Sequence, residues 1–456
     1  MAVSSDRGMW SGRLGFILAT AGSAVGLGNI WGFPIQVGQG GGAAFVLIYL
    51  ACVFLICVPI QIAEFAIGRR AQRAPVGAFR TISPSTRWWL VGALGTITGV
   101  GILSFYVVVA GWTLAYIWFA AAGSVGNSPE AIGGFFKAFA ANAPLNVCLT
   151  LVTLGMTAAI ILGGVRGGIE RASRALMPLL FGLLVLLAIR AVTLPGAADG
   201  LAYYLRPDFS SIADIRVFNA ALGQAFFSLS LGMGTLITYG SYLSKRESIG
   251  ASALWIAAID TTIALLAGFV IFPAGFSIAG FDPRTSGPSL IFEVLPRLFA
   301  TLPGGQLFGA AFFVLLFMAA LTSAISLLEV PVAHLIDQHR WSRRKAVLTV
   351  TVVTAVLALP SALGNGAVGF FTQLPGLGLD FLTLMATIWN NFSLPIGGFL
   401  TAIFVGYVWR VEGALSELLA EHAWFPQPHL WGAIIRYVCP VAIFVIIFFT
   451  VRALIG

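Results

Sequence analysis

The sequence predicts an all-α membrane protein that crosses the bilayer many times. Hydrophobic residues make up 59% of the chain and charged residues only 9%, whereas soluble domains carry about 25% charged residues. The mean hydropathy is +0.95. Apolar runs of about 20 residues, the length that crosses about 30 Å of hydrocarbon, recur from one end to the other. These observations exclude a mainly water-exposed globular protein.

The apolar runs are separated by short polar, glycine-rich or proline-rich segments, and eleven of them are long enough to span a bilayer. No segment between them is long enough for a soluble domain, so residues 1–456 form one transmembrane domain. The predicted spans are residues 13–35, 42–68, 88–121, 145–164, 170–193, 216–241, 249–279, 306–337, 344–363, 376–408 and 430–454.

The basic residues indicate the orientation. Most of the 25 lysine and arginine residues lie on one side of the spans if the N-terminus is inside, for example in residues 69–87, 166–174 and 340–345. This bias is typical of cytoplasmic loops. The sequence therefore predicts a multi-pass protein of the inner (plasma) membrane with a cytoplasmic N-terminus and an outside C-terminus. The net charge of +8 reflects topology, and no nucleic-acid partner is expected.

Two predicted spans contain helix-breaking residues near their middle. The first has three glycines and a polar Asn between Ala21 and Asn29, and the sixth has Ser228–Gly234, with two glycines. Glycine costs about 1 kcal/mol in a helix relative to alanine. Close helix packing of the small-xxx-small type explains Gly22 and Gly26 equally well. Two such segments five spans apart instead favour a transporter built from inverted repeats.

The repeats would cover approximately residues 13–193 and 216–408, with an extra helix at 430–454. Unwound backbone leaves carbonyl oxygens free to bind a cation. The half-helix after a break presents free N–H groups and a positive dipole end, which suit a carboxylate. No motif for an enzyme nucleophile or metal centre surrounds the four histidines, so no enzymatic activity is expected.

Several motifs resemble the neurotransmitter:sodium symporter family in its bacterial amino-acid branch. They are RLGFILA at 13–19, GLGNIW at 26–31, QAFFSLSLG at 224–232, FEVLP at 292–296 and LTSAIS at 321–326. The resemblance covers nearly the whole chain. With its eleven predicted spans, the chain is similar to the eleven-span variants of the family. It implies a LeuT-type fold, a 5+5 inverted repeat whose helices 1 and 6 are broken.

The resemblance also implies two sodium sites made of hard oxygen ligands, which suit a hard cation. The first would use Ala24, Asn29, Ser228 and Asp260 together with the carboxylate of the substrate. The second would use Gly22, Val25, Ala319, Thr322 and Ser323. The last three share one face of a helix at i, i+3 and i+4. The alternative for Thr322 and Ser323 is that their hydroxyls bond to their own helix carbonyls.

Asp260 departs from the Asn that is commoner at this position of the family. A carboxylate inside a membrane is costly, by about 3 kcal/mol on insertion scales, and is a functional candidate by default. Some relatives use chloride to balance the first sodium ion. Because Asp260 carries its own negative charge, the sequence predicts transport that does not require chloride.

The family's substrate pocket corresponds to residues of the first, third, sixth and eighth spans. They are Ser23, Ala24, Gly26, Gly28, Ile102, Tyr106, Phe227, Ser230, Met233, Ser323 and Leu327. Gly26 stands where amine-carrying relatives have an Asp, which favours a substrate with its own carboxylate. The pocket offers no charge for an ionic side chain, so it predicts a neutral, hydrophobic or aromatic L-amino acid.

Gates are implied on both sides of the pocket. The inner gate would be an Arg7–Asp337 salt bridge packed by Trp10 and Tyr242. The outer gate would use Tyr106, Phe227 and Asp380, but the usual arginine partner of Asp380 is replaced by Gly32. Either another cation serves there, or Tyr106 and Phe227 act alone.

Two alternatives stay open at this point, a proton-coupled carrier and an amino-acid sensor that does not transport. The hydroxyl set Ser228, Thr322 and Ser323 favours sodium. The expected partners are a small amino-acid substrate and the lipid bilayer, with the protein a monomer or weak dimer.

Overall fold

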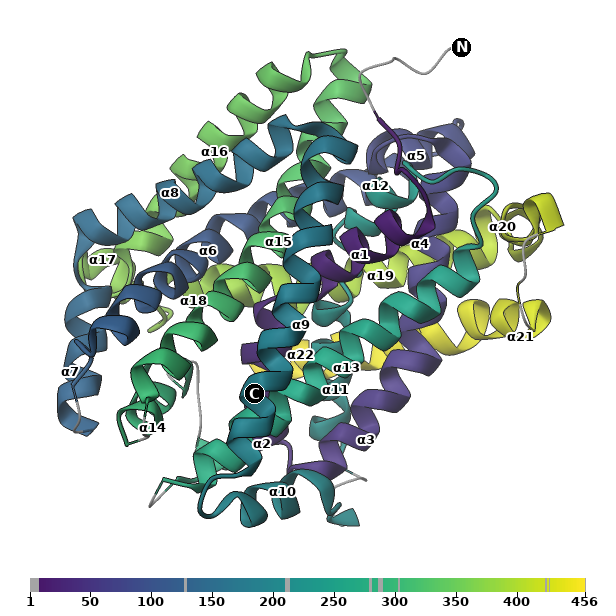
Figure 1. Cartoon of the computed structure of the whole chain (residues 1–456). Coiled ribbons are helices and arrows are strands. Elements are labelled where there is room, and N and C mark those ends of the chain that lie inside the picture. The colour runs from purple at the N-terminus through teal and green to yellow at the C-terminus, as the bar shows by residue number, and fades with distance from the viewer. Residues whose placement is uncertain are drawn as a thin grey trace.

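The computed structural model describes residues 8–126, 129–209, 214–278, 281–285, 290–301, 304–422, 425 and 427–455. All regular elements within these residues are helical, as the composition predicts. The helices form a single bundle in which the two longest, α6 (Trp89–Ala122) and α15 (Gly305–His339), pack against each other near the centre (Figure 1).

Within the described residues, nine continuous helices are long and apolar enough to cross a membrane. Several combine α-helical and π-helical turns. They are Ala43–Ala71 (α3 to α4), Trp89–Ala122 (α6), Ala143–Leu162 (α8), Val165–Val192 (ending in α9), Ile249–Phe276 (α13), Gly305–His339 (α15), Arg343–Leu363 (α16), Phe381–Val408 (α18 to α19) and Pro428–Arg452 (α21 to α22).

The first predicted span is broken as expected. Helix α1 (Arg13–Ala24) ends at the glycine-rich segment, and the chain resumes in a helical stretch, Gly28–Gln39, that ends in α2 (Phe33–Gln39). The two parts are bent by 49°. Val25 has φ −72° and ψ 100°, an extended conformation that stops the helix.

The sixth predicted span is also broken. It consists of α11 (Ile215–Ser228) and the short α12 (Thr235–Gly240). Between them Ser230, Gly232 and Gly234 have φ of +56°, +78° and +77°, which a right-handed helix cannot accommodate. Neither part alone is long enough to span a bilayer. The polytopic helical fold is thus confirmed, whereas the total of eleven spans stays a prediction.

Two predicted span starts are wrong. The fifth span was expected to begin at residue 170, but its helix begins at Val165. The tenth span was expected to begin at residue 376, but α18 begins at Phe381. Gly376 and Gly378 have positive φ values of +78° and +66°, and the Asp380 carboxylate accepts a hydrogen bond from the Thr383 N–H at 2.8 Å. Side-chain capping of this kind marks the start of a helix.

Short helices cover both ends of the bundle. One end, here called the α5 face, carries α5 (Pro75–Ile82) and α20 (Val411–Leu418). The other, the α10 face, carries α7 (Pro129–Ala140), α10 (Ala197–Leu205) and α14 (Leu295–Thr301) (Figure 1). The buried Phe292, just before α14, packs on Trp112, Tyr116 and Phe136, which holds this segment on the bundle. The α17 turn (Gly369–Thr372) precedes α18.

Candidate transport site

The two helix breaks meet against the middle of α15. The backbone carbonyl of Ser23 accepts hydrogen bonds from Ser230 Oγ at 3.2 Å and from Ser323 Oγ at 3.0 Å. The Val25 carbonyl lies 3.5 Å from Ser323 Oγ. Backbone oxygens that a continuous α1 would use internally therefore face the second break and α15.

A small cavity lies at this meeting point. Its lining includes all eleven residues that the family resemblance assigns to the substrate pocket: Ser23, Ala24, Gly26, Gly28, Ile102, Tyr106, Phe227, Ser230, Met233, Ser323 and Leu327. One further lining residue, Ser326, is missing from the prediction. Ser326 is three residues from Ser323 and therefore lies on the same face of the helix. This spacing could have predicted it as a lining residue.

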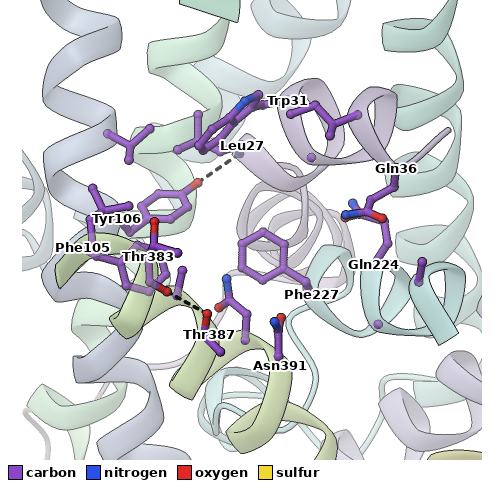
Figure 2. A pocket seen from close by; sticks show the side chains of 18 of the residues that line it. Leu27, Trp31, Gln36, Phe105, Tyr106, Gln224, Phe227, Thr383, Thr387 and Asn391 are labelled. Atoms are coloured by element: carbon purple, nitrogen blue, oxygen red, sulfur yellow. Dashed lines mark hydrogen bonds between the residues drawn. The ribbon is translucent and has the colours of Figure 1, made fainter. Parts of the chain in front are cut away.

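Glycine at position 26 keeps part of this cavity open. A Cβ atom at this position would overlap Ser323 Oγ and the Tyr106 hydroxyl. The Tyr106 hydroxyl accepts a hydrogen bond from the Leu27 N–H at 3.1 Å (Figure 2), which leaves its own proton free to donate. The Gly26 N–H is donated to Asn29 Oδ1 at 3.1 Å, so the first break combines the phenol proton of Tyr106 with an unfilled space, an arrangement that can receive a carboxylate.

Three of the residues predicted for the first sodium site form one buried cluster. Asn29 donates its amide N–H groups to Asp260 Oδ1 at 2.7 Å and to Ser228 Oγ at 3.0 Å. Ser228 Oγ donates to Asp260 Oδ2 at 2.8 Å. All three side chains are at most 1% exposed. This places a carboxylate and a hydroxyl beside the first break, hard oxygens that suit a hard cation. The Asn29 amide faces them with its nitrogen, and its oxygen accepts a hydrogen bond from the Gly26 N–H at 3.1 Å.

The residues predicted for the second sodium site lie on the opposite side of the first break. A Cβ at Gly22 would touch Thr322 Cβ at 3.5 Å, and Ser323 Oγ reaches the Val25 carbonyl as described above. Thr322 Oγ1 donates to the carbonyls of Ala319 and Met318 at 3.0 and 3.2 Å. The back-bonding alternative therefore holds for Thr322, while its oxygen lone pairs can still accept a cation.

A larger cavity of about 830 Å³ opens toward the α10 face. Tyr106 and Phe227 line both this vestibule and the smaller cavity. Figure 2 shows the Phe227 ring extending into the vestibule, with Tyr106 on one side and Gln224 on the other. These two aromatic residues therefore form the boundary between the cavities, where the sequence predicts the outer gate.

Asp380 also lines the vestibule, but its carboxylate binds the N–H and hydroxyl of Thr383, at 2.8 and 2.6 Å. The ion pairs found between described residues do not include it. Beside Gly32 lies the amide of Gln224, whose Nε2 donates to the Gly28 carbonyl at 2.8 Å. The sequence interpretation missed Gln224 because its partner is 196 residues away.

On the α5 side of the pocket, aromatic and charged side chains are closely packed. Trp10 donates from Nε1 to the Tyr239 carbonyl at 3.0 Å and packs on the Tyr242 ring. The Tyr242 hydroxyl donates to Glu329 Oε1 at 2.7 Å, and Arg343 pairs with Glu329 Oε2 at 2.6 Å.

The predicted Arg7–Asp337 pair is only partly described. Arg7 lies outside the described residues. Asp337 Oδ2 accepts a hydrogen bond from the Ala74 N–H at 2.6 Å, so its carboxylate faces the segment that leads into α5.

A further link on this side was not foreseen. Glu170, at the start of α9, is 2% exposed and accepts hydrogen bonds from the backbone N–H of Ser11, at 2.9 Å, and from the Ser11 hydroxyl. Arg174 pairs with the same carboxylate at 2.6 Å. Gly15 leaves room for it, because a Cβ there would overlap the Glu170 side chain. This cluster attaches the segment before α1 to α9.

Comparison with known proteins identifies the family. The profile of the sodium:neurotransmitter symporter family matches residues 7–126 and 134–455. An uncharacterized sodium-dependent transporter of Bacillus subtilis, YhdH, is 37% identical over 446 residues, with 96% of each chain covered. A similarly named protein of Haemophilus influenzae is 35% identical, covering 97% of this chain and 98% of the relative.

A solved structure shares the fold and much of the sequence. The crystal structure of MhsT in complex with L-phenylalanine superposes with a TM-score of 0.89 and 45% identity, covering 97% of this chain and 99% of MhsT. The fold is therefore the LeuT type, as the resemblance implies. The chain belongs to the sodium:neurotransmitter symporter family, whose members are sodium-dependent membrane transporters and not enzymes.

Proposed function

We propose that this transporter imports a neutral amino acid with a hydrophobic or aromatic side chain, driven by sodium through alternating access. The observation that carries the proposal is the small cavity between the two helix breaks. Its Gly26 end offers the proton of the Tyr106 hydroxyl to a carboxylate, and its other walls include the apolar Ile102, Met233 and Leu327. The solved MhsT structure, titled as a phenylalanine complex, supports this substrate class.

Two sodium ions accompany the substrate in this proposal. One is bound by Ala24, Asn29, Ser228 and Asp260 with the substrate carboxylate, and the other by Gly22, Val25, Ala319, Thr322 and Ser323. The Asn29–Ser228–Asp260 cluster and the contact of Ser323 Oγ with the Val25 carbonyl support these assignments. Because Asp260 supplies a negative charge beside the first ion, chloride is not required.

In the proposed cycle the α5 face is cytoplasmic, the protein lies in the inner (plasma) membrane, and the two repeats, residues 13–193 and 216–408, move around the fixed pocket. Phe227 and Tyr106 close the outer side. Arg7, Asp337, Trp10 and Tyr242 close the inner side. Gln224, which binds the Gly28 carbonyl beside Gly32, takes the place of the missing arginine in the outer gate.

Uptake into proteoliposomes tests the proposal. Labelled Leu, Met, Phe, Tyr and Trp are supplied with an inward sodium gradient, with sodium replaced by potassium, and with chloride replaced by gluconate. The expected result is sodium-dependent uptake of at least one of them that chloride replacement leaves unchanged.

Three other outcomes contradict it. Uptake that follows a proton gradient without sodium indicates the proton-coupled carrier. Binding without accumulation indicates a sensor. A loss of uptake in gluconate overturns the role given to Asp260.

A further inference from the structure

The pocket wall carries a pair of hydrogen-bonded serines whose hydroxyls have no assigned role in the proposed transport. Ser23 Oγ donates to Ser326 Oγ at 2.6 Å, and Ser326 Oγ donates to the Ser323 carbonyl at 2.8 Å. Ser23 is 2% and Ser326 1% exposed, and both line the cavity. The same cavity is lined by the apolar side chains of Ile102, Met233 and Leu327, so the two serines form a polar site among apolar residues.

The hydrogen bonds determine which kind of group this spot can recognise. A hydroxyl has one proton and two acceptor lone pairs. The protons of Ser23 and Ser326 are both donated within the protein, and those of Ser230 and Ser323 go to the Ser23 carbonyl. Among the residues that the structure describes, no hydrogen bond ends on Ser23 Oγ, and Ser326 Oγ accepts one. The remaining capacity of the pair therefore consists of acceptors.

The position of the pair decides which part of a substrate meets it. Ser323 lies beside Gly26, where the carboxylate is proposed to bind. Ser326 lies one helical turn farther along α15, a rise of about 5 Å. The ammonium and carboxylate of an amino acid share one carbon atom, so the ammonium stays near the first break and the side chain extends toward Ser326.

We propose that Ser23 and Ser326 recognise a hydrogen-bond donor at the tip of the substrate's side chain, an inference that rests on the proposed function. The substrate class this favours is an aromatic amino acid with a donor on its ring, the phenol of tyrosine or the indole of tryptophan. Burying such a donor without a partner is unfavourable. Since both serine protons already have acceptors within the protein, phenylalanine leaves no buried donor unpaired and is still accepted, so the discrimination is moderate rather than absolute.

Tyrosine and phenylalanine differ by one hydroxyl, so their ratio of kcat/KM for sodium-driven uptake isolates this contact. We expect this Tyr/Phe ratio to fall about tenfold in Ser326→Ala and in Ser23→Ala, because the loss falls mainly on tyrosine. Ser104→Ala is the matched control. Ser104 is fully buried and donates to the carbonyl three residues earlier, Gly101, at 2.7 Å, but lines neither cavity.

If the serine variants fail to fold, a competition measurement on the wild-type transporter still tests the proposal. There, 4-fluorophenylalanine, which has a similar shape and no donor, should compete less well than tyrosine. An unchanged Tyr/Phe ratio in both variants overturns the proposal. If the ratio is unchanged because uptake of both substrates falls equally, the serines contact the substrate ammonium instead. Sodium-driven uptake of other neutral amino acids with no uptake of aromatic ones overturns this inference and leaves the proposed function standing.

Discussion

The two sides of the pocket are closed by different chemistry. Toward the α5 face, Trp10 and Tyr242 pack over the buried Glu329–Arg343 pair. Toward the α10 face, the rings of Tyr106 and Phe227 separate the pocket from the vestibule, which the neutral amide of Gln224 lines. Asp380, the charged group of the predicted outer gate, caps its own helix instead of pairing across the vestibule.

The difference implies that the two sides cost different amounts to open. Leaving one member of a buried ion pair without its partner costs about 3–5 kcal/mol. A neutral hydrogen bond contributes about 0.5–1.5 kcal/mol. In the proposed cycle, an opening of the α5 side that separates Glu329 from Arg343 would therefore need a larger driving free energy than an opening of the α10 side, and bound sodium and substrate would provide it.

The strongest test of this asymmetry is Glu329→Ala. The variant leaves Arg343, which is 12% exposed, with an uncompensated charge and removes the acceptor of Tyr242. We expect the free energy of unfolding to fall by about 3–5 kcal/mol, measured by thermal denaturation of the purified protein in detergent. The double variant Glu329→Ala/Arg343→Ala should recover part of the loss, as expected for coupled groups. A double variant no more stable than the single one contradicts this interpretation.

A second test concerns the Glu170 cluster. Glu170→Gln keeps the size of the side chain and removes the charge that Ser11 and Arg174 contact. We expect amide hydrogen exchange in residues 8–15 to become about tenfold faster, because hydrogen bonds to a charged group are worth about 1.5–3 kcal/mol. Mass spectrometry measures the exchange. Arg166→Gln, an exposed change near Glu170, is the control and should leave it unaltered.

The outer side should respond more weakly. Gln224→Met has a similar length but cannot donate to the Gly28 carbonyl. Loss of one neutral hydrogen bond corresponds to about 1 kcal/mol, so we expect bound labelled substrate to dissociate about fivefold faster in sodium. Asn219→Ala, on the same helix and also lining the vestibule, should leave the dissociation rate unchanged. If Gln224→Met releases substrate at the wild-type rate, Gln224 has no role in the gate.

The smallest effect is expected for Asp380→Asn. Asn caps a helix about as well as Asp, and the acid has no ion-pair partner among the described residues. Uptake should stay within about twofold of wild type. A loss of more than tenfold would show that Asp380 does pair with a cation during transport, and would remove the contrast between the two sides.

The helices were largely predictable from sequence, because the apolar runs and the breaks at Gly26 and Gly232 are local signals. The start of the tenth span was not, since it depends on positive φ at Gly376 and Gly378 and on a cap by Asp380. A hydropathy pattern contains neither kind of information.

The resemblance predicted which residues lie together, since all eleven assigned residues line one cavity, while their role in binding substrate stays a prediction. The contacts that the sequence did not reveal join distant segments. Gln224 with Gly28 and Ser11 with Glu170 are 196 and 159 residues apart, and no spacing rule relates such positions. Ser326 differs from these, because its position on the face of Ser323 follows from helical spacing, and only its hydrogen bond with Ser23, 303 residues away, does not.

Gly26 has a consequence for which side chains this position can accept. An acidic side chain at this position would overlap Ser323 Oγ and the Tyr106 hydroxyl at once, and these residues also belong to the proposed sodium and carboxylate contacts. Any side chain at position 26 therefore has to displace Ser323 or Tyr106, and through them it would disturb the proposed sodium and carboxylate contacts together.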